Sequence, residues 1–459
     1  MESFQNDGDW WIPETSQQVS GRVHFSPTEG VELKLNGQLP TENNESEQSP
    51  ASNLNRQIPR IYGNLGRDGR VTVTGAVRTS ANLLGASGVT GEDYVANQLV
   101  MGAHLPVEST FERMSFTVDE IPAWSNASTI RPIIDTESVE EAIETDNLES
   151  VYVATEPVEY TAEFEDFQIE IFNGTTVSSE MHSTELETVG VLNIIPEDEA
   201  TLSRLFDLGI HAVEYLSLAV GTGVYPDELH VYTDSTDRSL DVFRLLPDYT
   251  GDRASSTVDY LFRPEHVEFG SSLSQWIEHR RQAPEVNENY RLLLHRSNLS
   301  PRLRFLTVVI ALEAYYDAKY PSSTLVPKDR FDEIQSDVMD VVPDESDLQG
   351  QLYGLFKHVV NTPSVKNKLE ELMRSEETLI GEFFDISDLA SEARDHRNDV
   401  AHGSIETSPQ HFQQLTLQLQ FVLEALLGRE IGVSQEVLMT TLANRHQGLL
   451  REMGHIDLS

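Results

Sequence analysis

The spacing of apolar residues changes near residue 268, and this change constrains the fold more than any other feature. Before it, apolar and polar residues alternate, as in Val19–Phe25 and Val71–Val77, which is the period of a half-buried β-strand. After it, apolar residues recur every three or four positions, as in Pro301–Tyr320, which is the period of a packed helix. We therefore predict an α+β chain with a β-rich domain at 1–267 and an all-α helical bundle at 268–459.

The remaining patterns predict where the individual elements lie. In the first domain, helical spacing predicts one helix from Pro196 to about Leu218, although Gly209 is unfavourable inside it. The other expected strands are Val31–Asn36, Arg60–Gly63, Tyr94–His104, Met114–Val118, Val151–Phe172, Glu187–Ile195, Leu229–Thr233 and Val258–Phe262, with a loop at Leu39–Ile58 and a linker at Ser138–Leu148. The expected later helices are Ser271–His279, which Tyr290–His295 could extend, Arg330–Val341, Asp347–Val360, Ser364–Arg374, Ile386–His402 and Ser408–Leu427.

The net charge of −44 is extreme, and the acidic residues are spread through every segment. Lysine is nearly absent, with six copies. A bias over the whole chain favours adaptation to molar intracellular salt, as in halophilic proteins, over the alternative of an acidic protein that repels nucleic acid. At about 1 M salt, charges are screened beyond ~3 Å, so a nucleic-acid site would depend on short-range contacts.

Several classes of site and location are excluded or disfavoured by composition. The chain has no cysteine, which excludes disulfides, thiolate catalysis and cysteine-bound metal. The 14 histidines are scattered, so no metal and no cofactor are expected. No apolar run is long enough to cross a membrane, and the first residues lack the pattern of a signal peptide, so we expect a cytoplasmic protein.

Near the end of the second domain, Arg397 and His402 lie five positions apart and Gly403 follows. A glycine is typical of the position just after a helix, so His402 is expected in the last helical turn, where the helix dipole favours the imidazolium form. Attack by an RNA 2′-hydroxyl on its own phosphate requires proton transfer, which suits an imidazole, and a cation on the phosphate, which suits a guanidinium. Asn398 shares a helix face with His402 and could orient either group.

The same pair also has a plain structural interpretation. Arg397 could bond a carboxylate such as Glu392 or Asp395, while His402 caps its own helix. Arg394 and His396 add positive charge beside the motif, which is unusual in so acidic a chain and favours the functional interpretation. Because one copy supplies one imidazole and the reaction needs both a base and an acid, we expect a homodimer or a higher homo-oligomer.

The segment Arg397–Gly403 resembles the Arg-polar-x3-His signature of HEPN domains, a helical family rich in metal-independent RNases. The helix Arg304–Tyr316 is similar to the Phe-Leu…Ala-Leu-Glu helix of that family. This resemblance implies that Glu313 supports the basic residues of the site.

The first domain resembles the ApeA-type N-terminal domain, and the order of its motifs is more specific than any one motif. The similar segments are Gly8–Glu14, Gly21–Phe25, Leu33–Gly37, Ile61–Gly63, Gly102–His104, Phe116–Trp124 and Leu216–Pro226. The resemblance implies an antiviral, abortive-infection endoribonuclease without a metal requirement, which cuts RNA such as tRNA after a phage protein or another phage cue activates it. The alternatives are a non-catalytic HEPN module that binds a nucleotide or a protein and a nucleotidyltransferase-associated toxin.

Overall fold

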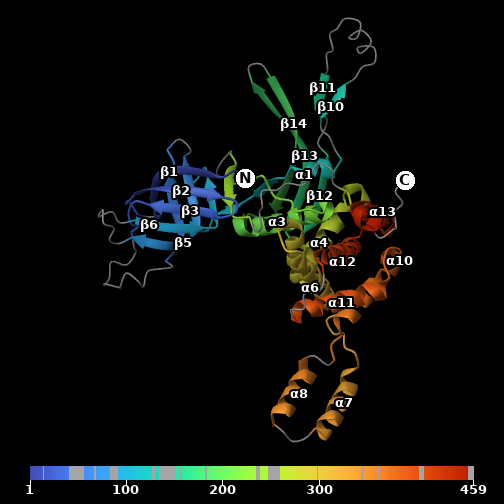
Figure 1. The fold of residues 1–459 in the computed structure, drawn as a ribbon. Coiled ribbons are helices and arrows are strands. Elements are labelled where there is room, and N and C mark those ends of the chain that lie inside the picture. Colours follow the sequence, from blue (N-terminus) through green and yellow to red (C-terminus); the bar gives the residue numbers. More distant parts are fainter. Residues whose placement is uncertain are drawn as a thin grey trace, which may run out of the picture. The chain divides into compact units, whose positions relative to one another are not determined.

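The computed structural model describes residues 1–13, 15–40, 56–66, 69–82, 91–126, 130–133, 151–154, 158–180, 183–233, 238–246, 259–296, 298–342, 346–358, 361–402 and 408–452. It divides into two compact units, Met1–Val258 with Arg263–Ser274, and Asp259–Phe262 with Gln275–Ser459. The first unit is β-rich and the second is helical (Figure 1), which confirms the α+β class. The domain boundary at 267/268 stays a prediction.

The β-rich unit is built on one antiparallel sheet with the strand order β12-β13-β14-β9-β16-β17-β7-β5-β4-β1-β2-β3-β6. Its strands are β1 (Phe4–Trp11), β2 (Val19–Ser26), β3 (Gly30–Leu35), β4 (Gln57–Asn64), β5 (Arg70–Asn82), β6 (Gly91–Ala96), β7 (Gln98–Met101), β9 (Arg113–Thr117), β12 (Glu159–Phe164), β13 (Phe167–Glu180), β14 (Ser183–Pro196), β16 (Glu228–Tyr232) and β17 (Leu240–Arg244). Two short pairs are separate from it, β8 (Thr110–Phe111) with β15 (Ala200–Thr201) and β10 (Ile130–Ile133) with β11 (Val151–Ala154).

Strand β5 closes part of this sheet into a barrel. Its first half pairs with β7, its second half pairs with β6, and β4 lies along its other edge. Since β6 also pairs with β3, the strands β5-β4-β1-β2-β3-β6 form a closed ring. The predicted single strand Tyr94–His104 is therefore wrong: the chain breaks at Asn97, because one segment pairs within the ring and the next pairs with β17.

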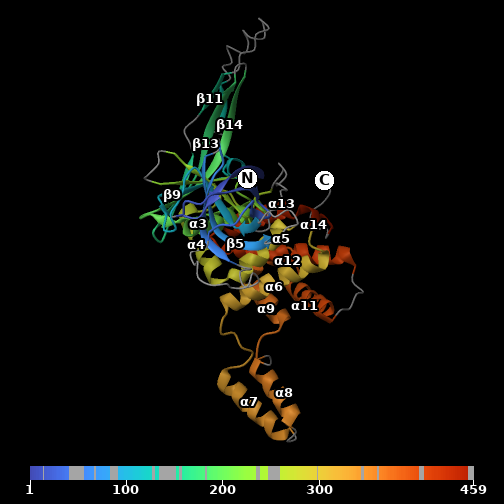
Figure 2. The same cartoon turned by 90° about the vertical axis from the view of Figure 1, so that its left-hand side faces the viewer.

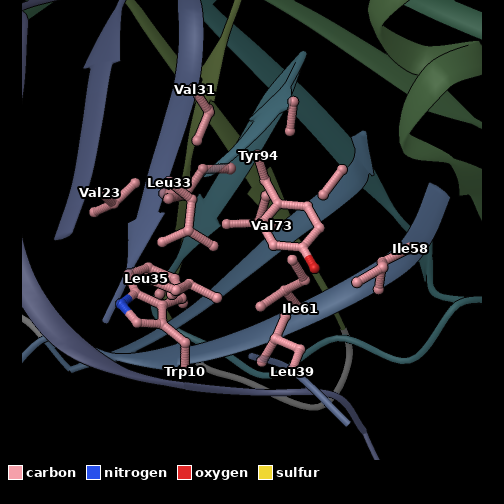
Figure 3. Packing of buried hydrophobic residues seen from close by; sticks show 14 of the residues in the cluster. Trp10, Val23, Val31, Leu33, Leu35, Leu39, Ile58, Ile61, Val73 and Tyr94 are labelled. Carbon is pink, nitrogen blue, oxygen red and sulfur yellow. The ribbon is translucent and has the colours of Figure 1, made fainter. Parts of the chain in front are cut away.

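The barrel interior is filled by the alternate side chains of its strands (Figure 3). Trp10, Val23, Ile61 and Val73 have no exposed surface. Full burial of a valine or isoleucine side chain stabilises a fold by about 1.5–3 kcal/mol. Gly63 is required beside Trp10, because a Cβ on Gly63 would lie 2.4 Å from the indole ring.

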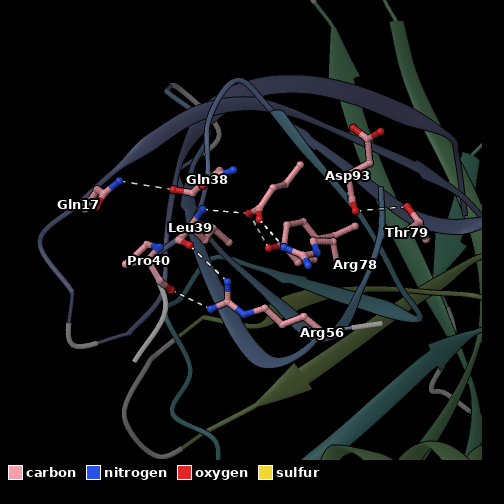
Figure 4. A network of polar contacts seen from close by, with 10 residues as sticks. Gln17, Gln38, Leu39, Pro40, Arg56, Arg78, Thr79 and Asp93 are labelled. Atoms are coloured by element: carbon pink, nitrogen blue, oxygen red, sulfur yellow. Dashed lines mark hydrogen bonds and ion pairs between the residues drawn. The ribbon is translucent and has the colours of Figure 1, made fainter. Parts of the chain in front are cut away.

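One buried ion pair holds a loop against the barrel (Figure 4). Arg78 donates to Glu92 at 2.8 Å, and both side chains are almost completely buried. The other carboxylate oxygen of Glu92 accepts from the Leu39 backbone at 3.0 Å and from the Tyr94 hydroxyl at 2.8 Å. Because both oxygens of this carboxylate have hydrogen-bond partners, the free-energy cost of burying its charge is offset. The rest of the predicted loop, residues 41–55, and the linker Ser138–Leu148 lie outside the described residues.

The helix of the β-rich unit, α3 (Leu202–Val220), begins six residues later than the sequence predicts. The expected start at Pro196 is wrong because β14 continues to that residue, and Thr201 then caps the helix by accepting from the Arg204 backbone. Gly209 is needed inside this helix, because a Cβ at that position would lie 2.0 Å from the Phe116 ring and collide with it. The short helix α1 (Glu120–Trp124) was not predicted.

The helices of the second region are α4 (Phe269–Gln282), α5 (Pro284–His295), α6 (Pro301–Lys319), α7 (Lys328–Val341), α8 (Ser346–His358), α9 (Val365–Ser375), α10 (Glu377–Ile380), α11 (Ile386–His402), α12 (Pro409–Glu430), α13 (Gln435–Arg445) and α14 (Gln447–Glu452). Serine side chains cap four of them, at Ser300, Ser364, Ser408 and Ser434. The proposed extension by Tyr290–His295 is wrong, because Pro284 starts a separate helix. The strand predicted at Val258–Phe262 is also wrong where it is described, since 259–262 form no strand and Leu261 and Phe262 are buried.

Helix α6 lies at the centre of the helical unit and contacts α5, α9, α11 and α12 (Figure 2). Beside it, Glu424 on α12 is fully buried and accepts hydrogen bonds from Gln420 at 2.9 Å and Tyr290 at 3.1 Å. Although burial alone would raise the pKa of Glu424, Arg445 at 3.3 Å and His446 at 3.0 Å lower it to about 2. Among the described helices, none combines the length and hydrophobicity that crossing a membrane requires.

Candidate active site

Helix α11 places Arg397 towards α6. Its buried residues Ile386, Leu389, Ala390 and Ala393 follow a helical stripe, and Arg397 comes one turn after the last of them. Asp385 directly precedes the helix and caps it, because its carboxylate accepts from the Asp388 backbone at 2.9 Å. Arg397 therefore lies on the face of α11 that packs against its neighbours, and its guanidinium reaches α6.

Arg397 and Glu313 face each other across α11 and α6. A guanidinium nitrogen, Nη2, lies 3.7 Å from Oε2 of Glu313, which is an ion-pair distance but too long for a hydrogen bond. The Arg397 side chain is 41% exposed and that of Glu313 is 20% exposed. The pair therefore leaves guanidinium donors directed to solvent, where an anion could bind them.

Burial raises the pKa of Glu313, and the charges of Arg397 and Lys368 limit that rise. Lys368 on α9 also forms an ion pair with Asp317, one turn after Glu313 on α6, at 2.6 Å. Two basic and two acidic side chains thus converge from three helices. Lys368 and Asp317 were not among the predicted residues, and their positions 51 residues apart gave no local signal.

The other predicted residues are arranged differently. Arg394 donates to its neighbour Asp395 at 2.6 and 2.9 Å, and Asn398 is exposed. The His402 side chain and Gly403 lie outside the described residues, so the Arg397–His402 pair stays a prediction. The alternative partners of Arg397, Glu392 and Asp395, have other bonds: Asp395 pairs with Arg394, and Glu392 pairs with His411.

His396 contacts a histidine that the sequence analysis did not single out. Its Nε2 lies 3.0 Å from Nε2 of His411 in the first turn of α12, and the rings meet edge to face with centroids 4.8 Å apart. Glu392 lies one turn before His396 on the same helix face, and its carboxylate is 2.9 Å from His411. The Glu392-x3-His396 spacing was the available signal, but His411 is joined to it only by the fold.

Near this cluster, α9, α10, α11 and α12 surround an open hollow of about 700 Å³. Its lining includes Glu377, Glu382, Asp385, Asp388 and Glu392. Among the described lining residues, Arg374 is the one that is basic. So many carboxylates repel a phosphate, and the exposed side of Arg397 is the better anion site.

Two family models match the chain in order. Residues 5–276 match the ApeA N-terminal domain 1, and residues 306–437 match the Apea-like HEPN domain. The chain belongs to the ApeA-type HEPN family. The HEPN match spans Glu313, all of α11 and His411, so the cluster of basic residues lies inside the family's domain. No curated protein and no solved structure matched the chain.

Proposed function

We propose that the HEPN domain is a metal-independent endoribonuclease of antiviral, abortive-infection defence, which cuts RNA such as tRNA. HEPN domains are generally RNases. The observation that carries the proposal is the half-exposed Arg397 guanidinium, held at 3.7 Å from a partly buried carboxylate. That arrangement fixes the direction of the side chain while its remaining donors stay available for a phosphate.

In this proposal each residue has one task. Arg397 binds the scissile phosphate and stabilises the charge that develops on it. His402 transfers the proton of the 2′-hydroxyl or of the leaving 5′-oxygen. Asn398, exposed on the same helix, orients His402 or the phosphate. Glu313 is a positioning residue, because it acts through Arg397.

The reaction also requires a second proton-transfer group. A two-fold dimer of HEPN domains would bring two copies of α11 together and supply two imidazoles to one RNA. The expected result of light scattering on the purified chain is therefore a dimer or a larger even-numbered oligomer. A stable monomer that cleaves RNA would contradict this part of the proposal.

The test is RNA cleavage by the purified chain in molar KCl with EDTA. Wild type is expected to cut labelled RNA, and His402→Ala is expected to lose about 10²–10⁴-fold in rate. Arg397→Ala is expected to lose about 10²–10³-fold. The matched control is Arg330→Ala, which removes an exposed arginine that pairs with Glu333 on α7 and should cleave at the wild-type rate.

The same experiment separates the alternative of a binding module. If wild type binds RNA or a nucleotide without cleaving it, and Arg397→Ala weakens that binding, the domain is non-catalytic. If His402→Ala cleaves as fast as wild type, the proposed role of His402 is wrong.

A further inference from the structure

Three metal-ligating side chains meet between α11 and α12. Glu392 and His396 lie one turn apart on α11, and His411 lies in the first turn of α12. One ligand atom from each residue lies within 4.8 Å of the other two, and the closest pairs are 2.9 and 3.0 Å apart. All three side chains are partly exposed, so an ion can reach them from solvent.

A proton on one of the rings does not give all three of these groups a good hydrogen bond. Nε2 of His411 faces both Nε2 of His396 and a carboxylate oxygen of Glu392. A ring nitrogen carries at most one hydrogen, so it cannot form two full hydrogen bonds at once. A cation placed between the three atoms would instead accept a lone pair from each.

The second ring nitrogen of His396 fits the same interpretation. Its Nδ1 lies 3.8 Å from the carboxylate of Asp399, one turn further along α11. A histidine that binds a metal commonly directs its other N–H towards a carboxylate, which leaves the ligating nitrogen with its lone pair. At 3.8 Å the contact is too long for a hydrogen bond, but the negative charge of Asp399 favours a proton on Nδ1.

We propose that Glu392, His396 and His411 bind one divalent transition-metal ion, with Zn²⁺ the best match to their chemistry. Two imidazoles and one carboxylate form a common three-residue set that leaves a fourth position open. With metal–ligand bonds of about 2.0–2.2 Å, tetrahedral ligand atoms lie roughly 3.3–3.6 Å apart. The separations of the three ligand atoms begin at 2.9 and 3.0 Å and do not exceed 4.8 Å, so they bracket this spacing.

The surrounding charges favour a cation there. Glu392 also lines the open hollow, whose lining includes Glu377, Glu382, Asp385 and Asp388. A concave surface lined by one sign of charge raises the local concentration of the opposite ion. The hollow therefore supplies cations to a site where two imidazoles select a transition metal over Mg²⁺ or K⁺.

The ion would join α11 to the start of α12. His396 precedes Arg397 directly, and successive helical residues point about 100° apart, so the metal ligands and the phosphate-binding guanidinium project in different directions. The ion thus steadies the end of α11 and takes no part in bond cleavage. The inference does not rest on the proposed RNase activity, because metal binding is measured without RNA.

Co²⁺ titration of the full chain, stripped with chelator, tests the proposal directly. Molar KCl and millimolar Mg²⁺ in every sample saturate the carboxylates on the surface of this acidic chain. We expect one Co²⁺ per chain with the visible absorption of a nitrogen-ligated site, which one equivalent of Zn²⁺ displaces. His411→Ala and Glu392→Gln are each expected to weaken binding by at least about tenfold.

His230→Ala is the matched control. His230 also has two acidic neighbours, Asp241 at 3.0 Å from Nδ1 and Glu228 at 3.3 Å from Nε2. Because they lie at opposite ring nitrogens, no single ion contacts all three, and this variant should bind Co²⁺ as wild type does. Circular dichroism checks that each variant is folded.

Two outcomes would overturn the proposal. One is a wild-type chain that takes up no Co²⁺ or Zn²⁺ at one equivalent in the presence of Mg²⁺. The other is equal binding by folded wild type, His411→Ala and Glu392→Gln. Cleavage of RNA in EDTA is a separate result, since the proposed chemistry uses no metal.

Discussion

Glu424 and Glu313 both face basic side chains within the helical unit, but only Glu424 is enclosed. Glu424 has no exposed surface and lies 3.3 Å from Arg445 and 3.0 Å from His446. Glu313 lies 3.7 Å from Arg397, which is 41% exposed. The pKa of Glu424 is lowered to about 2, whereas burial raises that of Glu313 above its usual value.

The difference separates an ion cluster that holds the fold from one that is available for binding. Around Glu424, close contacts and added hydrogen bonds compensate the buried charge, so removing the carboxylate takes a close counterion from two largely buried cations. Around Glu313, the contact is long and solvent reaches the cation, so the pair adds little to stability. A loosely paired, exposed guanidinium can exchange its carboxylate for a phosphate at small cost.

The largest expected effect is that of Glu424→Gln. Removing the charge leaves Arg445 and His446 buried without it, and we expect the helical unit to lose about 3–5 kcal/mol. Hydrogen exchange of the α12 amides measures this loss locally. If exchange in α12 is unchanged, the cluster does not have the structural role given to it.

A pH series sharpens the same contrast. The pKa of Glu424 is lower in the folded chain, at about 2, than its ordinary value of 4.5. Its contribution to stability is therefore complete above about pH 5 and is lost as pH falls towards 2. We expect the difference in free energy of unfolding between wild type and Glu424→Gln to narrow by about 2 kcal/mol between pH 6 and pH 3. A gap that widens on acidification would contradict the assignment.

Glu120 in the β-rich unit is the opposite case, because burial raises the pKa of its carboxyl and no described cation offsets that rise. One of its oxygens is buried without a hydrogen-bond partner, and burial raises its pKa to about 7. Wild type should thus lose stability as pH rises from about 4.5 to 7, while Glu120→Gln should not. Above pH 7 the variant is expected to be more stable by about 3 kcal/mol, with no difference at pH 4, as measured by thermal unfolding.

The smallest effect on stability is expected for Glu313→Gln. We expect the free energy of unfolding to fall by less than about 1 kcal/mol, because the two charged groups are far apart and partly exposed. RNA cleavage should nevertheless fall about tenfold, since Arg397 loses the group that orients it. The comparison fails if this variant is destabilised as much as Glu424→Gln.

The sequence predicted the order and type of the main elements but not how strands share partners. The 3.6-residue period located α6 and α11, because each buries residues at helical spacing. It also located α12, although that helix is buried on all sides from Leu419 to Gly428. It misplaced the start of α3 because Pro196 and the acidic residues 197–199 are typical of a first helical turn, whereas Thr201 is the cap. The division of the 94–104 segment into β6 and β7 depends on two different partner strands, which a local pattern does not record.

For the candidate site, local spacing found the residues on one helix and the family resemblance found the one on another. Arg397 was identified from its motif, and Glu313 was identified by resemblance and lies beside it. His411 and Lys368 were missed, because each meets its partner through packing of separate helices. Arg394 was included for its charge, but it bonds Asp395 on its own helix.

The shared strand β5 has a mechanical consequence for any signal that reaches the β-rich unit. Because Arg70–Asn82 hydrogen-bonds with β4, β6 and β7, one continuous strand joins the barrel to the open part of its own sheet. A molecule that binds the barrel could not tilt it alone without breaking backbone hydrogen bonds of β5. Any movement of the barrel therefore bends the continuous strands of the sheet or displaces the sheet as a whole.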